Sequence, residues 1–175
     1  WTMAGPARAV GLYGFGAAAH LLAQIVLAEG REVYAYTRPG DTAAQALARG
    51  LGATWAGGSD ETAPAALDAA ILFAPAGALV PVALAATRPG GTVVCAGIHM
   101  SDIPSFPYRL LWRERTLRSV ANLARDDGER FMAAAARVPL DVHATPYAFD
   151  RANEALDDLR AGRVSGAAVL TMPAD

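Results

Sequence analysis

Short apolar runs alternate with alanine-rich helical windows along the first 120 residues. The first run covers Ala9–Tyr13 and leads through a glycine turn into an apolar stretch that ends at Ala28. Arg31–Thr37 and Leu67–Ala74 are further β-rich runs, and Asp41–Arg49 between them has the spacing of an amphipathic helix. The run from Leu67 is apolar nearly throughout, which is typical of a strand buried on both faces of a sheet.

The same alternation continues toward residue 120. We expect further strands at Gly52–Trp55, Thr92–Ala96 and Leu117–Val120, a polar loop at Gly57–Glu61, and a helix at Ala78–Thr87. Strand–helix–strand units joined by short loops predict a parallel sheet covered on both faces. The fold class is therefore α/β, with a Rossmann-type doubly wound parallel sheet.

The pattern changes after Ala121. Asp126–Arg137 is expected to form an amphipathic helix, followed by a short extended piece at Tyr147–Phe149. Asp150 is expected to cap a helix that runs to about residue 161, and Ala167–Leu170 reads as a last strand. The chain thus ends in a short strand–helix–strand segment without a second glycine turn.

The glycine turn carries the candidate chemistry. It reads Gly14-x-Gly16-x-x-Ala19 and lies directly between the first strand and the first helix. Gly14 allows a sharp turn, Gly16 lets a pyrophosphate approach the backbone, and Ala19 permits close packing of helix on strand. The first-turn N–H groups and the helix dipole then favour an anion. We expect a dinucleotide site at Gly14, Gly16, Ala17, Ala18 and Ala19; the alternative is a plain strand–helix turn.

Composition narrows the class of protein further. Hydrophobic residues make up 53% and charged residues 18% of the 175 residues, which indicates a globular chain. A net charge of −2 argues against a nucleic-acid surface, and no apolar run reaches the ~20 residues that cross a membrane. A single cysteine excludes an intrachain disulfide and fits a reducing, cytoplasmic location. The start at Trp1 suggests a processed product or a fragment.

Four motifs in order resemble the zinc-dependent, medium-chain alcohol dehydrogenase family. They are V-G-L-Y-G-F-G-A-A-A-H, L-D-A-A-I-L-F-A-P-A-G, P-G-G-T-V-V-C-A-G-I-H and N-E-A-L-D-D-L-R-A-G-R-V-S-G-A-A-V-L. The resemblance implies that residues 1–120 are a dinucleotide-binding Rossmann domain and residues 121–175 the returning C-terminal piece of the catalytic domain. It also implies an oxidoreductase that moves a hydride between an alcohol or aldehyde and a nicotinamide.

The family's catalytic zinc site has no counterpart here, and we assign no catalytic or metal residue to this chain. Cys95 lies in a buried-strand pattern and is expected to be a core residue, while His20 is expected to pack near the phosphate end of the first helix. His20, His99 and His143 lack metal-ligand spacing. We expect zinc to be bound only in a domain that lies outside this chain. We expect no enzymatic activity from this chain alone.

The choice of dinucleotide depends on the end of the second strand. An NAD site usually has an acid there, about 20 residues after the glycines, whereas this chain has Thr37 and Arg38. Arg38 can pair with the 2′-phosphate of NADP, stack on adenine, or be a solvated loop cation. NADP is therefore favoured over NAD. Relatives often have an arginine that touches the pyrophosphate where this chain has Ala167.

Other cofactor contacts are expected where the fourth and fifth strands end. These residues are Phe73, Pro75 and Ala76, then Gly97, Ile98 and His99. Phe73 is equally compatible with core packing, and His99 with either the nicotinamide region or the surface. Ile103–Trp112 is rich in aromatic residues and proline, and in relatives this region lies beside the dimer contact. A homodimer contact and a buried loop are both open.

Two other function classes share the glycine turn. A non-catalytic dinucleotide-sensing Rossmann domain would keep the turn and also lack metal ligands. A methyltransferase normally has an acid on the ribose at the second strand's end, so Thr37 and Arg38 argue against it. In each case the expected partner is a small molecule, with no nucleic acid and no membrane.

Overall fold

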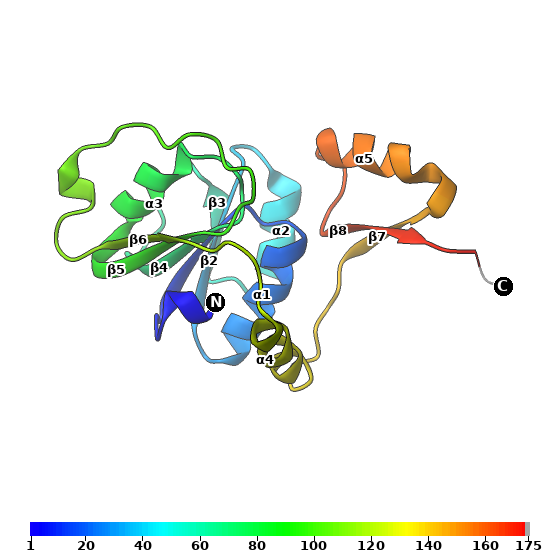
Figure 1. Ribbon diagram of the computed structural model, residues 1–175, viewed down its shortest axis with the longest axis horizontal. Helices are drawn as coiled ribbons and strands as arrows, with labels where there is room; N and C mark the ends of the chain where they lie inside the picture. Colours follow the sequence, from blue (N-terminus) through cyan, green and yellow to red (C-terminus); the bar gives the residue numbers. More distant parts are fainter. Residues whose placement is uncertain (174–175) are drawn as a thin grey trace.

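A six-stranded parallel sheet forms the centre of the molecule in the computed structural model, which describes residues 1–173. The strand order is β3-β2-β1-β4-β5-β6 (Figure 1). The strands are β1 (Ala9–Tyr13), β2 (Glu32–Thr37), β3 (Trp55–Gly58), β4 (Leu67–Leu72), β5 (Thr87–Cys95) and β6 (Thr116–Ser119). The predicted Rossmann-type doubly wound sheet is confirmed.

Helices cover both faces of this sheet. On one face, α1 (Ala17–Ala28) and α2 (Thr42–Gly50) pack over β1 and β2 in one apolar cluster. On the other face, α3 (Leu79–Ala86) packs in a second cluster over β1, β4 and β5. The two faces follow from the strand order, because right-handed crossovers that run in opposite directions from β1 and β4 place their helices on opposite sides.

Aromatic side chains cover the sheet where the connection from β3 to β4 has no helix. Tyr36 stacks on Tyr13 with ring centroids 4.2 Å apart, and Trp55 lies 4.9 Å from Tyr36. Tyr34 and the partly buried Ala63 of the connecting loop belong to the same cluster. These rings supply the apolar contact that a crossover helix would otherwise make.

Two strand predictions were shifted along the chain. The third strand begins at Trp55 rather than Gly52, because Gly52 and Ala53 still donate hydrogen bonds to carbonyls of α2. Gly57 and Gly58, both predicted as loop, therefore lie within β3. The fifth strand begins at Thr87, five residues before the predicted Thr92, because Thr87 already pairs with Leu67 ahead of a register irregularity.

The last third of the chain forms a separate small unit beside the sheet (Figure 1). After α4 (Arg125–Ala135), β7 (Ala144–Ala148) and β8 (Ala167–Thr171) pair in parallel, and α5 (Ala152–Arg160) connects them. The expected cap at Asp150 is wrong. That residue belongs to a short 3-10 turn, and the N-cap position falls to Arg151, which makes no side-chain cap bond.

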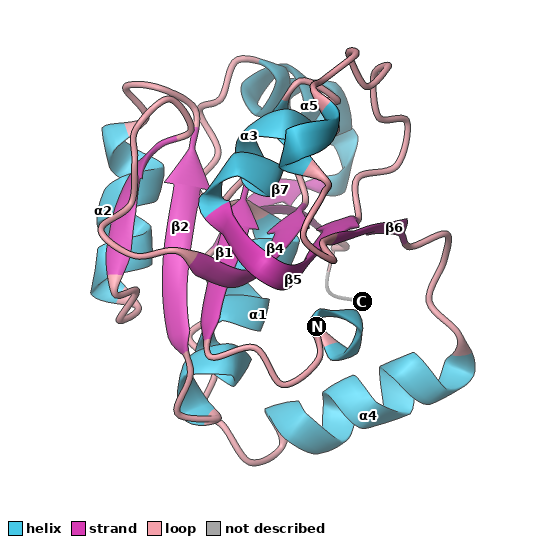
Figure 2. Cartoon of the chain, turned by 90° about the vertical axis from the view of Figure 1, so that its left-hand side faces the viewer, coloured by secondary structure: helices cyan, strands magenta, loops and turns pink. Residues whose placement is uncertain are grey.

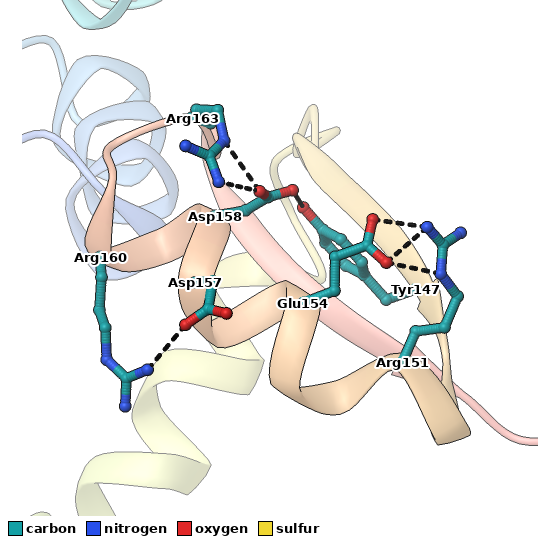
Figure 3. Close-up of polar contacts among 7 residues, drawn as sticks. All are labelled: Tyr147, Arg151, Glu154, Asp157, Asp158, Arg160 and Arg163. Carbon is teal, nitrogen blue, oxygen red and sulfur yellow. Dashed lines mark hydrogen bonds and ion pairs between the residues drawn. The ribbon is translucent and has the colours of Figure 1, made fainter.

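A network of hydrogen bonds and ion pairs connects the elements of this C-terminal unit (Figure 3). The Tyr147 hydroxyl on β7 donates to Asp158 on α5 at 2.7 Å, and the Arg163 guanidinium donates to the same carboxylate at 2.6 and 2.9 Å. These hydrogen bonds hold the pKa of Asp158 below its usual range. Arg151 pairs with Glu154 one turn away. The strand, the helix and the following loop are thereby fastened to one another.

Candidate functional site

The carboxyl ends of the parallel strands bring the predicted site segments to one edge of the sheet. Figure 2 shows β1, β2, β4 and β5 side by side, and the turns that follow them are the turns singled out from the sequence. In open α/β sheets this edge is where ligands bind. The topology therefore places the glycine turn near the middle of the candidate site.

Gly14 makes the turn that leaves β1. Its φ is +88°, and its N–H donates to the Tyr36 carbonyl at 2.8 Å. A Cβ atom at this position would lie 2.9 Å from the backbone nitrogen of Ala74. Both the backbone conformation and the close approach of the loop after β4 therefore require glycine.

Gly16 is the N-cap of α1 and faces open space. Glycine has no side chain with which to cap the helix, and a Cβ built on Gly16 would meet no atom of residues 1–173 within 4 Å. Ala17 and Ala18 are exposed, while Ala19 is fully buried against the sheet. The N–H groups of a first helical turn have no carbonyl partner within the helix and carry the positive end of its dipole, so this turn favours an anion.

Thr37 and Arg38 have different environments. Thr37 is only 4% exposed, and its hydroxyl accepts a hydrogen bond from Gln45 and contacts the Gly57 carbonyl. Arg38 is exposed and has no ion-pair partner within residues 1–173. Its guanidinium lies beside Gly162, at the carboxyl end of α5. The hydrogen bonds of the Thr37 hydroxyl thus hold the end of β2 against Gly57 and Gln45. The exposed guanidinium of Arg38 is accessible from solvent at the same place.

The loop after β4 and the loop after β5 are packed so closely that their backbones are in contact. Phe73 donates its N–H to the Tyr13 carbonyl at 2.9 Å, and a Cβ on Gly97 would lie 2.9 Å from the Cα atom of Pro75. Pro75 and the following Ala76 belong to the loop after β4. Ile98 is 63% exposed, and His99 is exposed with a φ of +56°. The two loops present backbone groups and one imidazole to the edge of the sheet.

Sequence reasoning missed two features of this edge. The Ser101 hydroxyl accepts a hydrogen bond from the Gly77 N–H at 2.9 Å and locks the two loops together. Val120 donates its N–H to the Cys95 carbonyl, so the residues that follow β6 lie at the same edge. The predicted sixth parallel strand was the signal for the second feature, because its carboxyl end had to lie there.

A polar seam that the sequence did not reveal fastens α1 to the segment between α4 and β7. Gln24 donates from its amide nitrogen to the Asp141 carbonyl at 2.9 Å and accepts from the Asp141 N–H at 2.7 Å. His20, one turn earlier on α1, is fully buried and faces His143. His20 lies near the N-terminus of α1, as its contact with the Gly16 carbonyl shows.

Within residues 1–173, no three histidine, cysteine or acidic side chains converge as metal ligands. Cys95 is partly buried at the end of β5, where burial raises the pKa of its thiol. Within the same residues, no helix has the length and apolar character needed to cross a membrane.

Comparison with known proteins gives a consistent picture. The chain is 46% identical over 166 residues to a protein named probable alcohol dehydrogenase AdhA from Mycobacterium tuberculosis, covering 94% of this chain and 47% of that protein. It superposes with a TM-score of 0.82 at 20% identity on the cinnamyl alcohol dehydrogenase SbCAD4 of Sorghum bicolor, covering 98% of this chain and 49% of the other.

A second solved structure, the Bacillus subtilis protein yhfP with NAD bound, superposes with a TM-score of 0.77 at 16% identity. The superposition includes 97% of this chain and 57% of the yhfP chain. No family model matches the sequence. The chain thus spans about half the length of the curated relative it matches, over the half that contains the Rossmann fold.

Proposed function

Because the chain is related to the nucleotide-binding part of the medium-chain, zinc-dependent alcohol dehydrogenase family, we propose that it binds NADP(H) or NAD(H). The whole protein would be an NAD(P)-dependent oxidoreductase that interconverts an alcohol and an aldehyde. The observation that carries this proposal is the uncapped N-terminus of α1, which opens to solvent at Gly16 between a glycine turn and a buried alanine.

The residues of this chain would bind and orient the cofactor. The first-turn N–H groups of α1 hold the diphosphate, and Gly14 keeps the turn close enough to β4 for them to do so. The loops at Phe73–Ala76 and Gly97–His99 fix the nicotinamide end through backbone groups. When bound, the nicotinamide supplies a hydride acceptor or donor. The chain itself contributes position and the exclusion of water rather than acid–base chemistry.

Arg38 would set the preference between the two dinucleotides. Its guanidinium has no ion-pair partner in the described part of the chain, and the two residues at the end of β2, Thr37 and Arg38, include no acid. A planar guanidinium forms charge-assisted hydrogen bonds with a phosphate, so the 2′-phosphate of NADP is favoured. The neighbouring α5 end bounds the space on the far side, since Gly162 lies against the guanidinium.

Residues 121–175 would be the returning piece of the catalytic domain, as the division at residue 120 implies. In residues 1–173 the sheet of this unit has two strands; Val169 and Leu170 on β8 are each 42% exposed, and Met172 just after β8 is 69% exposed. A two-stranded sheet is marginal on its own and is stabilised by packing on further structure. We propose that the half of the protein outside this chain covers these side chains.

A homodimer contact is proposed at Ile103–Trp112. Tyr108 and Trp112 are 72% and 59% exposed, and a groove beside them is also lined by Pro89, Arg113 and Glu114. Exposed aromatic side chains in one place favour a protein contact. Sedimentation of the purified chain at several concentrations measures whether it self-associates.

Cofactor titration by calorimetry tests the proposed function. The chain should bind NADP⁺ and NAD⁺, with NADP⁺ the tighter ligand, whereas adenosine without a diphosphate should bind far more weakly. Absence of any dinucleotide binding would refute the proposal. Binding without alcohol oxidation by the complete protein would instead favour the non-catalytic, dinucleotide-sensing class.

A further inference from the structure

The carboxyl end of α5 lies against the guanidinium of Arg38. A Cβ atom on Gly162 would be 3.7 Å from the Nη1 atom of Arg38, which is an ordinary van der Waals distance. Arg38 follows β2 of the large sheet, whereas Gly162 belongs to the C-terminal unit (Figure 1). The two units therefore meet at the side chain that is proposed to bind the 2′-phosphate of NADP.

The backbone hydrogen bonds at the end of α5 fix the conformation of Gly162. Its φ is +69°, and its N–H donates to the Leu159 carbonyl at 3.1 Å. The next N–H, that of Arg163, donates to the Asp158 carbonyl at 2.9 Å. These two bonds form a Schellman motif, in which glycine is the usual residue and asparagine the next most common. The direction of a side chain at residue 162 is thereby set, and it is toward Arg38.

The two aspartates near this end of α5 are paired with arginines other than Arg38. Asp157 accepts from Arg160 at 2.9 Å, and Asp158 accepts from Arg163 at 2.6 and 2.9 Å (Figure 3). Each of these carboxylates thus has a cationic partner within its own unit. The helix presents the negative end of its dipole to Arg38, which favours a cation there less strongly than a carboxylate would.

The C-terminal unit is anchored to α1 at the start of its small sheet. Gln24 exchanges two hydrogen bonds with the backbone of Asp141, at 2.9 and 2.7 Å. Two residues later, the His143 carbonyl accepts from the N–H of Ala167, the first residue of β8, and β7 begins at Ala144. Both strands therefore start from the segment that Gln24 holds. Because α5 connects these strands, the same anchor helps to place its carboxyl end.

We propose that Gly162 determines the choice of dinucleotide together with Arg38, because it bounds the 2′-phosphate site without offering the guanidinium a side-chain partner. The inference rests on the proposed function and extends it by assigning part of the cofactor site to the C-terminal unit. The backbone beside the guanidinium limits its motion, which lowers the entropy lost when a phosphate binds. A carboxylate at residue 162 would instead pair with Arg38 and repel the 2′-phosphate.

Gly162→Asp and Gly162→Asn form a matched pair for the test. Both side chains tolerate the left-handed conformation, and they differ mainly in one charge. Gly162→Asp should weaken NADP⁺ binding by roughly ten- to fiftyfold and leave the affinity for NAD⁺ within about twofold. Gly162→Asn should change neither affinity by more than about threefold, because it adds no charge. Calorimetric titrations with both dinucleotides measure these effects, after urea unfolding has shown that each variant is folded.

Two further measurements separate this role from a purely structural one. In an Arg38→Ala background, Gly162→Asp should weaken NADP⁺ binding by a smaller factor, because the ion pair that removes Arg38 from the ligand cannot form. The unmutated chain keeps the inference testable if Gly162→Asp fails to fold. Its amide NMR signals at Gly162 and Arg163 should shift on addition of NADP⁺, and by much less on addition of NAD⁺.

Three results would overturn the inference while leaving the proposed function in place. They are an unchanged NADP⁺ affinity in folded Gly162→Asp, an equal loss of NADP⁺ and NAD⁺ affinity in that variant, and amide signals at residues 162 and 163 that respond equally to both dinucleotides. No binding of either dinucleotide to the unmutated chain would refute the inference and the proposed function together.

Discussion

Replacement of Gly16 by valine should separate ligand binding from folding. A Cβ at this position meets no atom of the described residues within 4 Å, and the backbone is extended, with φ −106° and ψ −154°. Valine adopts that conformation readily, and it restricts the unfolded chain more than glycine does. A poorer N-cap offsets this gain, so the free energy of unfolding should change by no more than about 1 kcal/mol.

The effect on the cofactor should be far larger. A valine side chain would occupy the open space in front of the first turn of α1, where the diphosphate is expected. Loss of about two charge-assisted hydrogen bonds, each contributing roughly 1.5–3 kcal/mol, amounts to about 3–6 kcal/mol. That corresponds to a reduction in affinity of roughly two to four orders of magnitude. Calorimetric titration with NADP⁺, together with urea unfolding, measures both quantities on the same variant.

Two matched glycine variants complete this experiment. Gly14→Ala should cost about 2–4 kcal/mol of stability, because alanine at a φ of +88° is strained and its Cβ would press on Ala74. Gly50→Val also points into open space, but at the end of α2, and should leave NADP⁺ affinity unchanged. Unchanged NADP⁺ affinity in Gly16→Val would refute the assignment of the diphosphate to the α1 N-terminus.

Three further predictions concern other parts of the chain. Arg38→Ala should weaken NADP(H) binding by roughly five- to thirtyfold, less at high salt, and leave NAD(H) nearly untouched in paired titrations; equal weakening of both would contradict a 2′-phosphate contact. Burial opposes ionisation of Asp68, but hydrogen bonds from Arg88 and the N–H groups of Arg8 and Ala9 outweigh it and hold the pKa of that carboxyl below its ordinary value. The stabilisation by ionised Asp68 is therefore present above about pH 4 and is lost as pH falls through the lowered pKa. Asp68→Asn should lower the free energy of unfolding by about 1–3 kcal/mol at pH 7, measured by urea unfolding. The variant should also lose less stability than the unmutated chain as the pH is lowered below 4. Metal analysis of the purified chain should find no stoichiometric zinc, and alcohol oxidation should be undetectable; turnover that follows the chain through purification would show that its catalytic residues were misplaced.

Local sequence patterns were sufficient for the sheet and for the glycine turn. The uninterrupted apolar run in β4 indicates burial on both faces, and the strand–helix alternation then allows few topologies. The spacing of Gly14, Gly16 and Ala19 identified the turn, because each position has a local steric reason. The confirmed family resemblance uses these same segments.

The ends of strands and helices that depend on contacts with other parts of the chain could not be predicted from local sequence. Thr87 joins β5 because Leu67 of another strand lies opposite it, and the residues before Thr87 look like the end of a helix. Asp150 had the residue type of a helix cap, but the 3-10 turn after β7 moved the helix start beyond it. In both cases contacts with the rest of the fold outweighed local propensity.

The sequence by itself therefore determined the fold class and the glycine turn, because these depend on periodicity and on local backbone sterics, and its four motifs carried the family resemblance. Only the tertiary structure decided which side chains meet across long separations. Gln24 and Asp141 are 117 positions apart, and nothing in either neighbourhood indicates that they bond. The same holds for His20 and His143, whose contact exists because the chain after α4 returns across α1. Such contacts depend on the path of the chain in space, which local patterns do not encode.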